Sequence, residues 1–246
     1  RVVIGGSACP QAVIEAFQRD YGVRVLHAWG MTETSPLGTF CSFKPEITAK
    51  PEAERMETQL KVGHPPFTVD MSLRDDLGAE VPWDGASRGR LLIRGPGVVG
   101  RYLKAEAPAT DAEGWFDTGD VATVDPLGYV RIVDRTKDVI KSGGEWISSI
   151  DLENVAVGHP DVAEAAAVGV AHPKWGERPV IVVVAKEGRT VDAASVRAHL
   201  AARFAKWQLP DDVIVVDALP HTATGKLSKL TLRRDLEARG YRLPGT

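Results

Sequence analysis

Cysteine is scarce in this 246-residue chain, and its scarcity excludes two classes of site. The two cysteines, Cys9 and Cys41, lie far apart and have no histidine or second cysteine at metal-ligand spacing. Neither a zinc site nor a disulfide framework is therefore indicated. A cytoplasmic protein fits this cysteine usage best.

Charge of one sign and long apolar runs are also lacking. The chain has 30 Lys and Arg against 33 Asp and Glu and a pI near 6.1, so it has no broad basic field for nucleic acid. No run approaches the roughly 18 apolar residues that a membrane span requires. We therefore expect small-molecule partners and no integral membrane segment. The 43% of hydrophobic residues is enough for a proper core.

The first residues have the pattern of a larger fold. The sequence begins without methionine, and Val2 to Ile4 form an apolar, strand-like run directly before a Gly-Gly step. We expect the chain to be a fragment that lacks a preceding segment. A strand (Arg1 to Ile4), a helix (Gln11 to Tyr21) and a second strand (Val23 to Ala28) follow in order, which predicts a β-α-β unit of a parallel sheet.

Two further residue patterns follow along the chain. Short apolar runs punctuated by Gly, Pro and Asp extend from Val62 to Asp134 and predict antiparallel strands in a small barrel or sandwich. A polar stretch, DRTKD, comes next and places a domain boundary near Thr136 and Lys137. Beyond it we predict a compact α+β domain with helices at Ile150–Val157 and Ala193–Lys206, and strands at Ala163–Val170, Val180–Ala185 and Val213–Val216.

Two loops in the first half carry residues suited to a nucleotide. HAWGMTETSP, His27 to Pro36, offers hydroxyls for a phosphate and Glu33 for Mg²⁺, although Thr-Glu-Thr-Ser is also an ordinary helix cap. WFDTGD has a glycine for a tight turn that delivers Asp120 to the hydroxyls of a ribose, although an Asp-Gly hairpin turn would have the same sequence.

Two more segments lie in the second half. In DRTKDVIKSGGEWISS, Arg135 offers a fork of donors, and Gly143 and Gly144 let a ligand pass close to the backbone; a solvated linker with a turn is the alternative. In LPHTATGKLSK, Thr224 and Gly225 form a turn that projects Lys226, which suits anionic oxygens but is also what a solvated loop lysine looks like.

The order of these four segments is more specific than any one of them. They resemble, in the same order, the core motifs of the adenylate-forming superfamily, which includes acyl-CoA synthetases, firefly-luciferase-like enzymes and peptide-synthetase adenylation domains. The resemblance extends from Arg1 to about Arg239, and KSGGEWIS resembles medium- and long-chain fatty acyl-CoA ligases and methylthiopropionate-CoA ligases.

The resemblance implies a reaction in two steps. A carboxylate attacks the α-phosphate of ATP to give an acyl-adenylate, and the CoA thiol then displaces AMP. The implied substrates and cofactors are a carboxylic acid, ATP, CoA and Mg²⁺. The resemblance also implies that the family's loop for the β- and γ-phosphates lies before Arg1, so this chain would carry about half of the site.

The resemblance also implies roles for individual residues. Gly5, Gly6 and Ser7 would lie beside the adenine and the acyl carbonyl, and Trp29 would take the place of the usual adenine-stacking aromatic, often Tyr. Gly30 and Met31 belong to the same loop; Thr32 would bind the α-phosphate, Glu33 the Mg²⁺, Asp120 the ribose, and Arg135 the ribose or phosphate. Lys226 would bridge carboxylate and phosphate oxygens during adenylation.

For the thioester step, the family alternates between two orientations of its C-terminal domain, with Lys137 at the pivot position. Rotation would withdraw Lys226 and bring the Lys141 to Trp146 loop to the site, with Gly143 and Gly144 lining the pantetheine tunnel.

The expected fold combines α/β and α+β domains. Residues 1–60 would form the end of a large α/β adenylation domain, 61–135 a small β-barrel-like subdomain, 136–137 the hinge and 138–246 a mobile C-terminal α+β lid. Two alternatives stay open beside a CoA ligase: an acyl-AMP ligase that loads a carrier protein, and a non-catalytic AMP-binding remnant. A homo-oligomer is compatible with the sequence.

Overall fold

The computed structural model describes residues 1–6, 9–223 and 225–243. These residues divide into two compact units, Arg1–Thr136 (unit 1) and Lys137–Thr246 (unit 2), which are considered one at a time below. Among the described residues, no helix is both long and apolar enough to cross a lipid bilayer.

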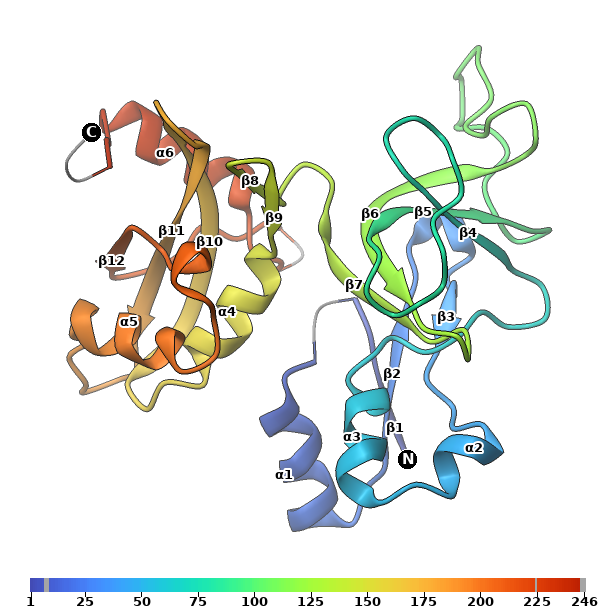
Figure 1. Ribbon diagram of the computed structural model, residues 1–246, viewed down its shortest axis with the longest axis horizontal. Helices are drawn as coiled ribbons and strands as arrows, with labels where there is room; N and C mark the ends of the chain where they lie inside the picture. The colour runs from blue at the N-terminus through green and yellow to red at the C-terminus, as the bar shows by residue number, and fades with distance from the viewer. Residues whose placement is uncertain (7–8, 224, 244–246) are drawn as a thin grey trace. The chain divides into compact units, whose positions relative to one another are not determined.

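Unit 1 begins with the expected β-α-β arrangement (Figure 1). Strand β1 (Val2–Ile4) pairs in parallel with β2 (Val25–Trp29), and α1 (Gln11–Tyr21) connects them. The helix ends at Gly22, whose left-handed φ of 61° suits glycine. On its inner face Ile14 is fully buried against β2. A short strand, β3 (Thr39–Phe40), adds to the other edge of β2 in the antiparallel sense.

A second sheet in unit 1 has four antiparallel strands in the order β4, β5, β6, β7. The sequence prediction of antiparallel strands is thus confirmed, but the described strands form an open sheet rather than a closed barrel. Two helices, α2 (Pro45–Thr48) and α3 (Glu52–Gln59), precede this sheet. Its strands are β4 (Asp70–Arg74), β5 (Gly89–Arg94), β6 (Phe116–Val124) and β7 (Val130–Arg135).

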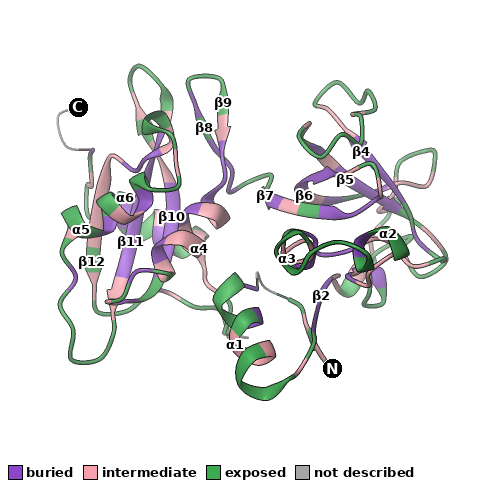
Figure 2. Ribbon diagram, turned by 60° about the horizontal axis from the view of Figure 1, so that its bottom comes forward, coloured by how far each residue is buried: buried purple, intermediate pink, exposed green. Residues whose placement is uncertain are grey.

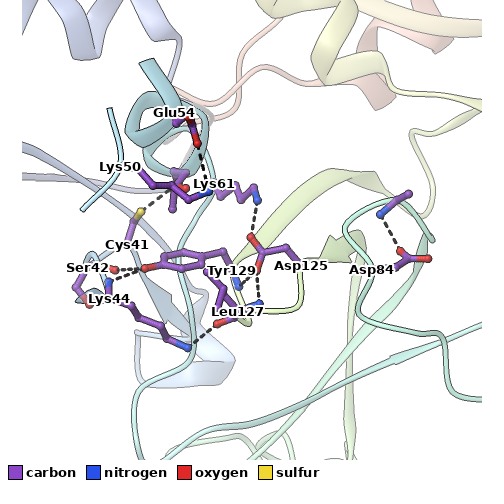
Figure 3. Close-up of polar contacts among 12 residues, drawn as sticks. Cys41, Ser42, Lys44, Lys50, Glu54, Lys61, Asp84, Asp125, Leu127 and Tyr129 are labelled. Atoms are coloured by element: carbon purple, nitrogen blue, oxygen red, sulfur yellow. Dashed lines mark hydrogen bonds and ion pairs between the residues drawn. The ribbon is translucent and has the colours of Figure 1, made fainter. Parts of the chain in front are cut away.

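Buried polar contacts join the two sheets of unit 1 (Figure 3). The fully buried Tyr129, next to β7, donates its hydroxyl to the Ser42 carbonyl at 2.9 Å and accepts from the Lys44 amide at 2.8 Å. Lys61 pairs with Asp125 at 2.6 Å, and the same carboxylate accepts from the Tyr129 amide. Because these partners are far apart in sequence, they hold the residues after β3 onto the β6–β7 connection.

Unit 2 contains a five-stranded sheet with helices on both faces. Strand β11 is central: antiparallel β10 runs along one of its edges. Its other edge is shared by β12, which pairs in parallel with Val180–Val184, and by the β8–β9 hairpin, whose Ser142 pairs with Gly176. The strands are β8 (Ile140–Ser142), β9 (Glu145–Ile147), β10 (Val162–His172), β11 (Gly176–Ala185) and β12 (Asp212–Val216); the helices are α4 (Ser149–Val157), α5 (Ala193–Ala201) and α6 (Lys229–Ala238).

Successive side chains of β10 point to opposite faces of the sheet, and both faces are covered by helices. Ala165 and Ala167 pack with the buried residues of α4 and α5, whereas Ala166 and Val168 pack with Leu232 and its neighbours on α6. Figure 2 shows the middle of β10 and β11 in the buried colour. A strand buried on both faces reads as a continuous apolar run, as this one does.

One predicted helix was too long. The sequence predicts a helix over Ala193–Lys206, but α5 ends at Ala201, and a separate 3₁₀ helix, η2, covers Lys206–Gln208. The chain turns after α5 so that Phe204 and Leu209 pack against the core beneath the sheet. Tertiary packing outweighs local helix propensity at this point.

Candidate functional site

The loop after β2 is shaped by close backbone contacts. A Cβ on Gly30 would lie 1.9 Å from the Pro36 carbonyl oxygen, so only glycine fits there. The buried Thr34 hydroxyl accepts from the Met31 amide at 3.0 Å and lies 2.6 Å from the Pro36 carbonyl oxygen. These contacts fold residues 32–34 into the 3₁₀ helix η1 and leave Thr32 exposed at its start.

Three residues that are distant in sequence meet beside this loop. The Trp29 indole Nε1 donates to Asp120 Oδ2 at 2.9 Å, and the Arg135 Nε pairs with Asp120 Oδ1 at 2.9 Å. Arg135 Nη1 also donates to the Thr118 carbonyl at 3.2 Å. Asp120 is 2% exposed, whereas the Arg135 side chain is 45% exposed. The structure therefore brings together the predicted adenine-stacking residue and the two predicted ribose-binding residues.

Burial dominates the electrostatics of Asp120. Loss of solvent raises the pKa of its carboxyl from 3.8 to about 6, against the lowering effects of Arg135 and of the Trp29 hydrogen bond. The nearby carboxylates Asp134 and Asp117 raise the pKa further. Asp120 is thus an ionisable group that is shielded from solvent and has a shifted pKa, as is common at functional sites.

The sequence prediction of a tight turn at WFDTGD was wrong. Asp117 to Asp120 lie within β6, and Asp120 is directly opposite Arg135 on β7. Gly119 has a left-handed φ of 70°, and the register of the two strands shifts between Val121 and Ala122. Asp120 is thus presented by an irregular strand, not by a hairpin turn.

Glu33 has a partner that sequence reasoning missed. The Tyr102 hydroxyl donates to Glu33 Oε1 at 2.9 Å, and the Val99 amide donates to the Glu33 carbonyl at 2.8 Å. The bond to Glu33 raises the pKa of the Tyr102 phenol. No spacing or composition signal in the sequence links Tyr102 to Glu33, since 69 residues separate them.

The residues after β1 are only partly described. Gly5 and Gly6 are exposed; a Cβ on Gly5 would lie 2.9 Å from the Ala28 carbonyl oxygen, and Gly6 has a left-handed φ of 82°. Ser7, also predicted to lie beside the adenine, falls outside the described residues. Gly5 thus lies against the last residues of β2, close to where the Trp29 loop begins.

In unit 2 the predicted thioester loop is the turn of the β8–β9 hairpin. Gly143 and Gly144 have left-handed φ values of 62° and 87°, which favour glycine at both positions. The Gly143 amide donates to the Trp175 carbonyl at 2.8 Å, and a Cβ on Gly143 would lie 3.0 Å from the Trp175 ring. On the paired positions of the hairpin, the Lys141 ammonium lies 5.5 Å from the centre of the Trp146 ring.

Lys226 lies in an exposed turn of unit 2. The Thr222 amide donates to the Lys226 carbonyl at 2.7 Å, the Lys226 amide donates to the Thr222 hydroxyl at 3.2 Å, and His221 forms a bridge with Leu227. Its ammonium has no partner among the described residues of the chain. Thr224, part of the predicted turn, lies outside those residues.

The backbone is anchored on each side of the boundary between the units. In unit 1 the Thr136 amide donates to the Gly119 carbonyl at 2.9 Å. In unit 2 Arg233 of α6 donates to the Lys137 carbonyl at 3.2 Å and to the Asp138 carboxylate at 2.7 Å. The backbone between these anchors contains the dihedral angles of Thr136 and Lys137.

Two family models match the chain. Residues 1–103 match the AMP-binding enzyme family, and residues 151–226 match the AMP-binding enzyme C-terminal domain. Together the two matches take in most of the sequence, in the order that the superfamily resemblance requires.

Curated relatives agree with these matches. The chain is 50% identical over 237 residues to the 3-methylmercaptopropionyl-CoA ligase of Ruegeria pomeroyi, covering 95% of this chain and 43% of that protein. It is 43% identical over 234 residues to the medium-chain-fatty-acid–CoA ligase of Ectopseudomonas oleovorans, again covering 95% of this chain and 43% of the relative. The chain therefore spans less than half of the length of these relatives.

Solved structures share the fold. The ATP-bound MatB of Rhodopseudomonas palustris matches with a TM-score of 0.80 at 30% identity, over 96% of this chain and 45% of that one. The o-succinylbenzoate CoA synthetase (MenE) of Bacillus subtilis, in complex with its acyl-adenylate intermediate, matches with a TM-score of 0.81 at 31% identity, over 94% and 45%. On these grounds, and on the four motifs in order, the chain belongs to the AMP-binding enzyme family of the adenylate-forming superfamily, together with the acyl-CoA ligases.

Proposed function

We propose that this chain is part of an ATP-dependent acid:CoA ligase that forms an acyl-adenylate and then an acyl-CoA thioester. The observation that carries the proposal is the meeting of Trp29, Asp120 and Arg135 through two contacts of 2.9 Å. An aromatic ring, a carboxylate and a guanidinium are the groups that a nucleoside phosphate requires for its base, its ribose and its anionic oxygens. The names of relatives at 43–50% identity support CoA as the acceptor.

In the adenylation step, the acid's carboxylate oxygen bonds to the α-phosphorus of ATP and pyrophosphate leaves. Thr32 lies exposed at the start of η1, where its hydroxyl and the loop amides can face the α-phosphate. Lys226 supplies a mobile cation for the charge that develops on the oxygens around the reacting phosphorus. The acid, ATP and CoA are the proposed small-molecule partners.

The residues around Glu33 fit a magnesium ion bound mainly through the nucleotide. One oxygen of Glu33 accepts from Tyr102, which leaves the other for a metal. No group of three or more His, Cys, Asp or Glu side chains converges anywhere in the described part of the chain. Mg²⁺ commonly binds through one or two carboxylates plus phosphate oxygens and water, and Glu33 can supply such a carboxylate. When bound, the ion would neutralise phosphate charge.

In the thioester step, the CoA thiol attacks the acyl carbonyl and AMP leaves. The hairpin turn at Gly143 and Gly144 has no side chains at its tip, so a narrow pantetheine arm can pass along the backbone there. Lys141 and Trp146, paired across the hairpin, provide a cation and an aromatic ring beside that turn. Lys137, between the two backbone anchors, is the proposed pivot. Rotation about it would take Lys226 away from the reacting groups and bring this hairpin to them.

The proposed domain roles follow the same order as the family motifs. Residues 1–60 would contribute the end of the nucleotide-binding domain and residues 61–135 the adjoining β-subdomain. Residues 136–137 would act as the hinge, and 138–246 as the lid. We propose medium- or long-chain fatty acids as the acid, with 3-methylmercaptopropionate as the principal competitor because of the name of a relative at 50% identity.

The experiment uses the protein expressed from its complete gene. Pyrophosphate exchange into ATP is measured with octanoate, palmitate and 3-methylmercaptopropionate, and products are then identified by mass with CoA or with a phosphopantetheinylated carrier protein. Acid-dependent exchange and an acyl-CoA product are expected. Acylation of the carrier but not of CoA would favour an acyl-AMP ligase, and an absence of exchange with every acid would favour a non-catalytic AMP-binding protein.

A further inference from the structure

The buried carboxylate of Asp120 has two donors that differ in how firmly they are held. Trp29 lies in β2, packs against the core of the second sheet, and its ring is so close to Gly38 that a Cβ there would lie 2.2 Å from the indole Cζ3. Arg135 is the last residue of β7, and its side chain is 45% exposed. The indole donor is therefore fixed by packing, whereas the guanidinium can move into solvent.

The acceptor capacity of Asp120 is only half used by these donors. An ionised carboxylate has about four acceptor positions, two on each oxygen. Trp29 occupies one position on Oδ2, and Arg135 occupies one on Oδ1. One position on each oxygen remains, which matches the two adjacent hydroxyls of a ribose. At 2% exposure, however, Asp120 cannot be reached until one of its present neighbours moves.

We propose that Trp29 is a ribose-selectivity residue: its indole N–H is the fixed donor that positions Asp120, and Arg135 is the partner that the ribose hydroxyls displace. This inference rests on the proposed function, because it takes a nucleotide as the ligand. Residue 29 then acts on the sugar through Asp120 in addition to any contact with the base.

The indole is well suited to this role because it can only donate. A Trp N–H has no acceptor lone pair, so it stabilises the ionised form of the carboxylate, which is the form that accepts from two hydroxyls. A phenylalanine would keep an aromatic face but would leave Asp120 Oδ2 without this donor. Loss of a hydrogen bond to a buried charged group is costly and also frees the carboxylate to rotate.

The test compares ATP with 2′-deoxy-ATP and 3′-deoxy-ATP in the protein expressed from its complete gene. Trp29 is replaced by Phe and, by site-specific incorporation, by 3-benzothienylalanine, which has the shape of Trp but a sulfur in place of the N–H. Trp83→Phe is the control, since Trp83 is a partly exposed tryptophan of the same unit. Dissociation constants for the three nucleotides are measured for each protein.

We expect the natural protein and Trp83→Phe to prefer ATP over each deoxy analogue by about tenfold, the usual effect of one unpaired polar group. In both Trp29 variants the preference should fall below about threefold, mainly through weaker ATP binding. Equal weakening of ATP and the deoxy analogues in the benzothienyl variant would overturn the inference and leave the proposed function intact. A natural protein that binds no ATP would instead refute the proposed function itself.

A spectroscopic readout separates positioning from general damage. In ¹⁵N-labelled protein, the indole N–H assigned to Trp29 by the loss of its signal in Trp29→Phe should remain protected from exchange with water when ATP is added, and should lose that protection in Asp120→Ala. The Arg135 Nε–H signal should move on ATP addition. The opposite pattern, with the indole contact broken by ATP and the arginine contact retained, would contradict the proposal.

Discussion

Asp120 should make unit 1 less stable at neutral pH than at mildly acidic pH. The pKa of its carboxyl in the folded chain is about 6, against 3.8 for the ordinary group, and the largest cause is burial. The folded chain therefore binds a proton at Asp120 more tightly than the unfolded chain does. The free energy of unfolding must fall as the pH rises from about 4 to about 7, and this group contributes little further change above that range.

The size of the effect follows from the two pKa values. A difference of one pKa unit corresponds to about 1.4 kcal/mol, so the ionised Asp120 costs unit 1 about 3 kcal/mol at pH 7 relative to pH 3. Between pH 7 and pH 5 the same linkage gives a change of about 1 kcal/mol. Asp120→Asn does not titrate, so it removes this dependence.

The assay measures unfolding in urea of the natural chain and of Asp120→Asn, at pH 5 and at pH 7. Unfolding of unit 1 is followed by hydrogen exchange of a peptide from β6. A peptide from β10, which reports on unit 2, is the internal control. The difference in the free energy of unfolding between the two proteins should change by about 1 kcal/mol, with the natural chain gaining relative stability at pH 5. A difference that is equal at both pH values would refute the assignment of burial as the dominant cause.

A second carboxylate of unit 1 provides a matched control with the opposite sign. Asp84 is exposed and accepts hydrogen bonds from the Ser87 amide, the Ser87 hydroxyl and the Ala86 amide, which lower its pKa to about 2. The Asp84 carboxyl is ionised at pH 5 and at pH 7 in the folded chain, and almost fully ionised at both pH values in the unfolded chain. Asp84→Asn should therefore change stability equally at the two pH values.

Four further outcomes are expected in the protein expressed from its complete gene. Lys226→Ala should slow adenylation by roughly 10²–10³-fold while thioester formation from preformed acyl-adenylate changes little; equal loss in both half-reactions, measured separately, would contradict its role. Lys137→Pro fixes φ near −65° and should abolish one half-reaction while the other persists; normal overall turnover would show that no pivot is needed there. Tyr102→Phe should raise the Mg²⁺ concentration needed for half-maximal adenylation by about threefold or more, because Glu33 loses the donor that orients it; an unchanged Mg²⁺ titration would exclude this role. Arg178→Met should destabilise unit 2 by about 3–5 kcal/mol in urea unfolding, because the buried guanidinium pairs with Asp211 at 2.7 Å and bonds three further oxygens; a loss below about 1 kcal/mol would refute this.

Apolar periodicity and turn residues were sufficient to predict most of the secondary structure. The helix over Gln11–Tyr21 was predicted with its observed bounds, and the parallel pairing of the strands around it is confirmed. The helix depends on local signals, namely Pro10 at its start and the apolar spacing of Val13, Ile14 and Phe17. Element ends that depend on packing, such as the end of α5 at Ala201, were predicted less well.

The sequence by itself determined the family, because four short motifs in a fixed order are specific even when each is ambiguous alone. Only the tertiary structure decided the surroundings of Asp120. The sequence predicted a turn there, but Asp120 lies within a strand, is shielded from water, and contacts both Trp29 and Arg135. Likewise, only the structure links Tyr102 to Glu33, 69 residues earlier. The physical reason is that motif order is written along the chain, whereas burial and hydrogen bonding between distant residues depend on strand register and packing, which no local pattern specifies.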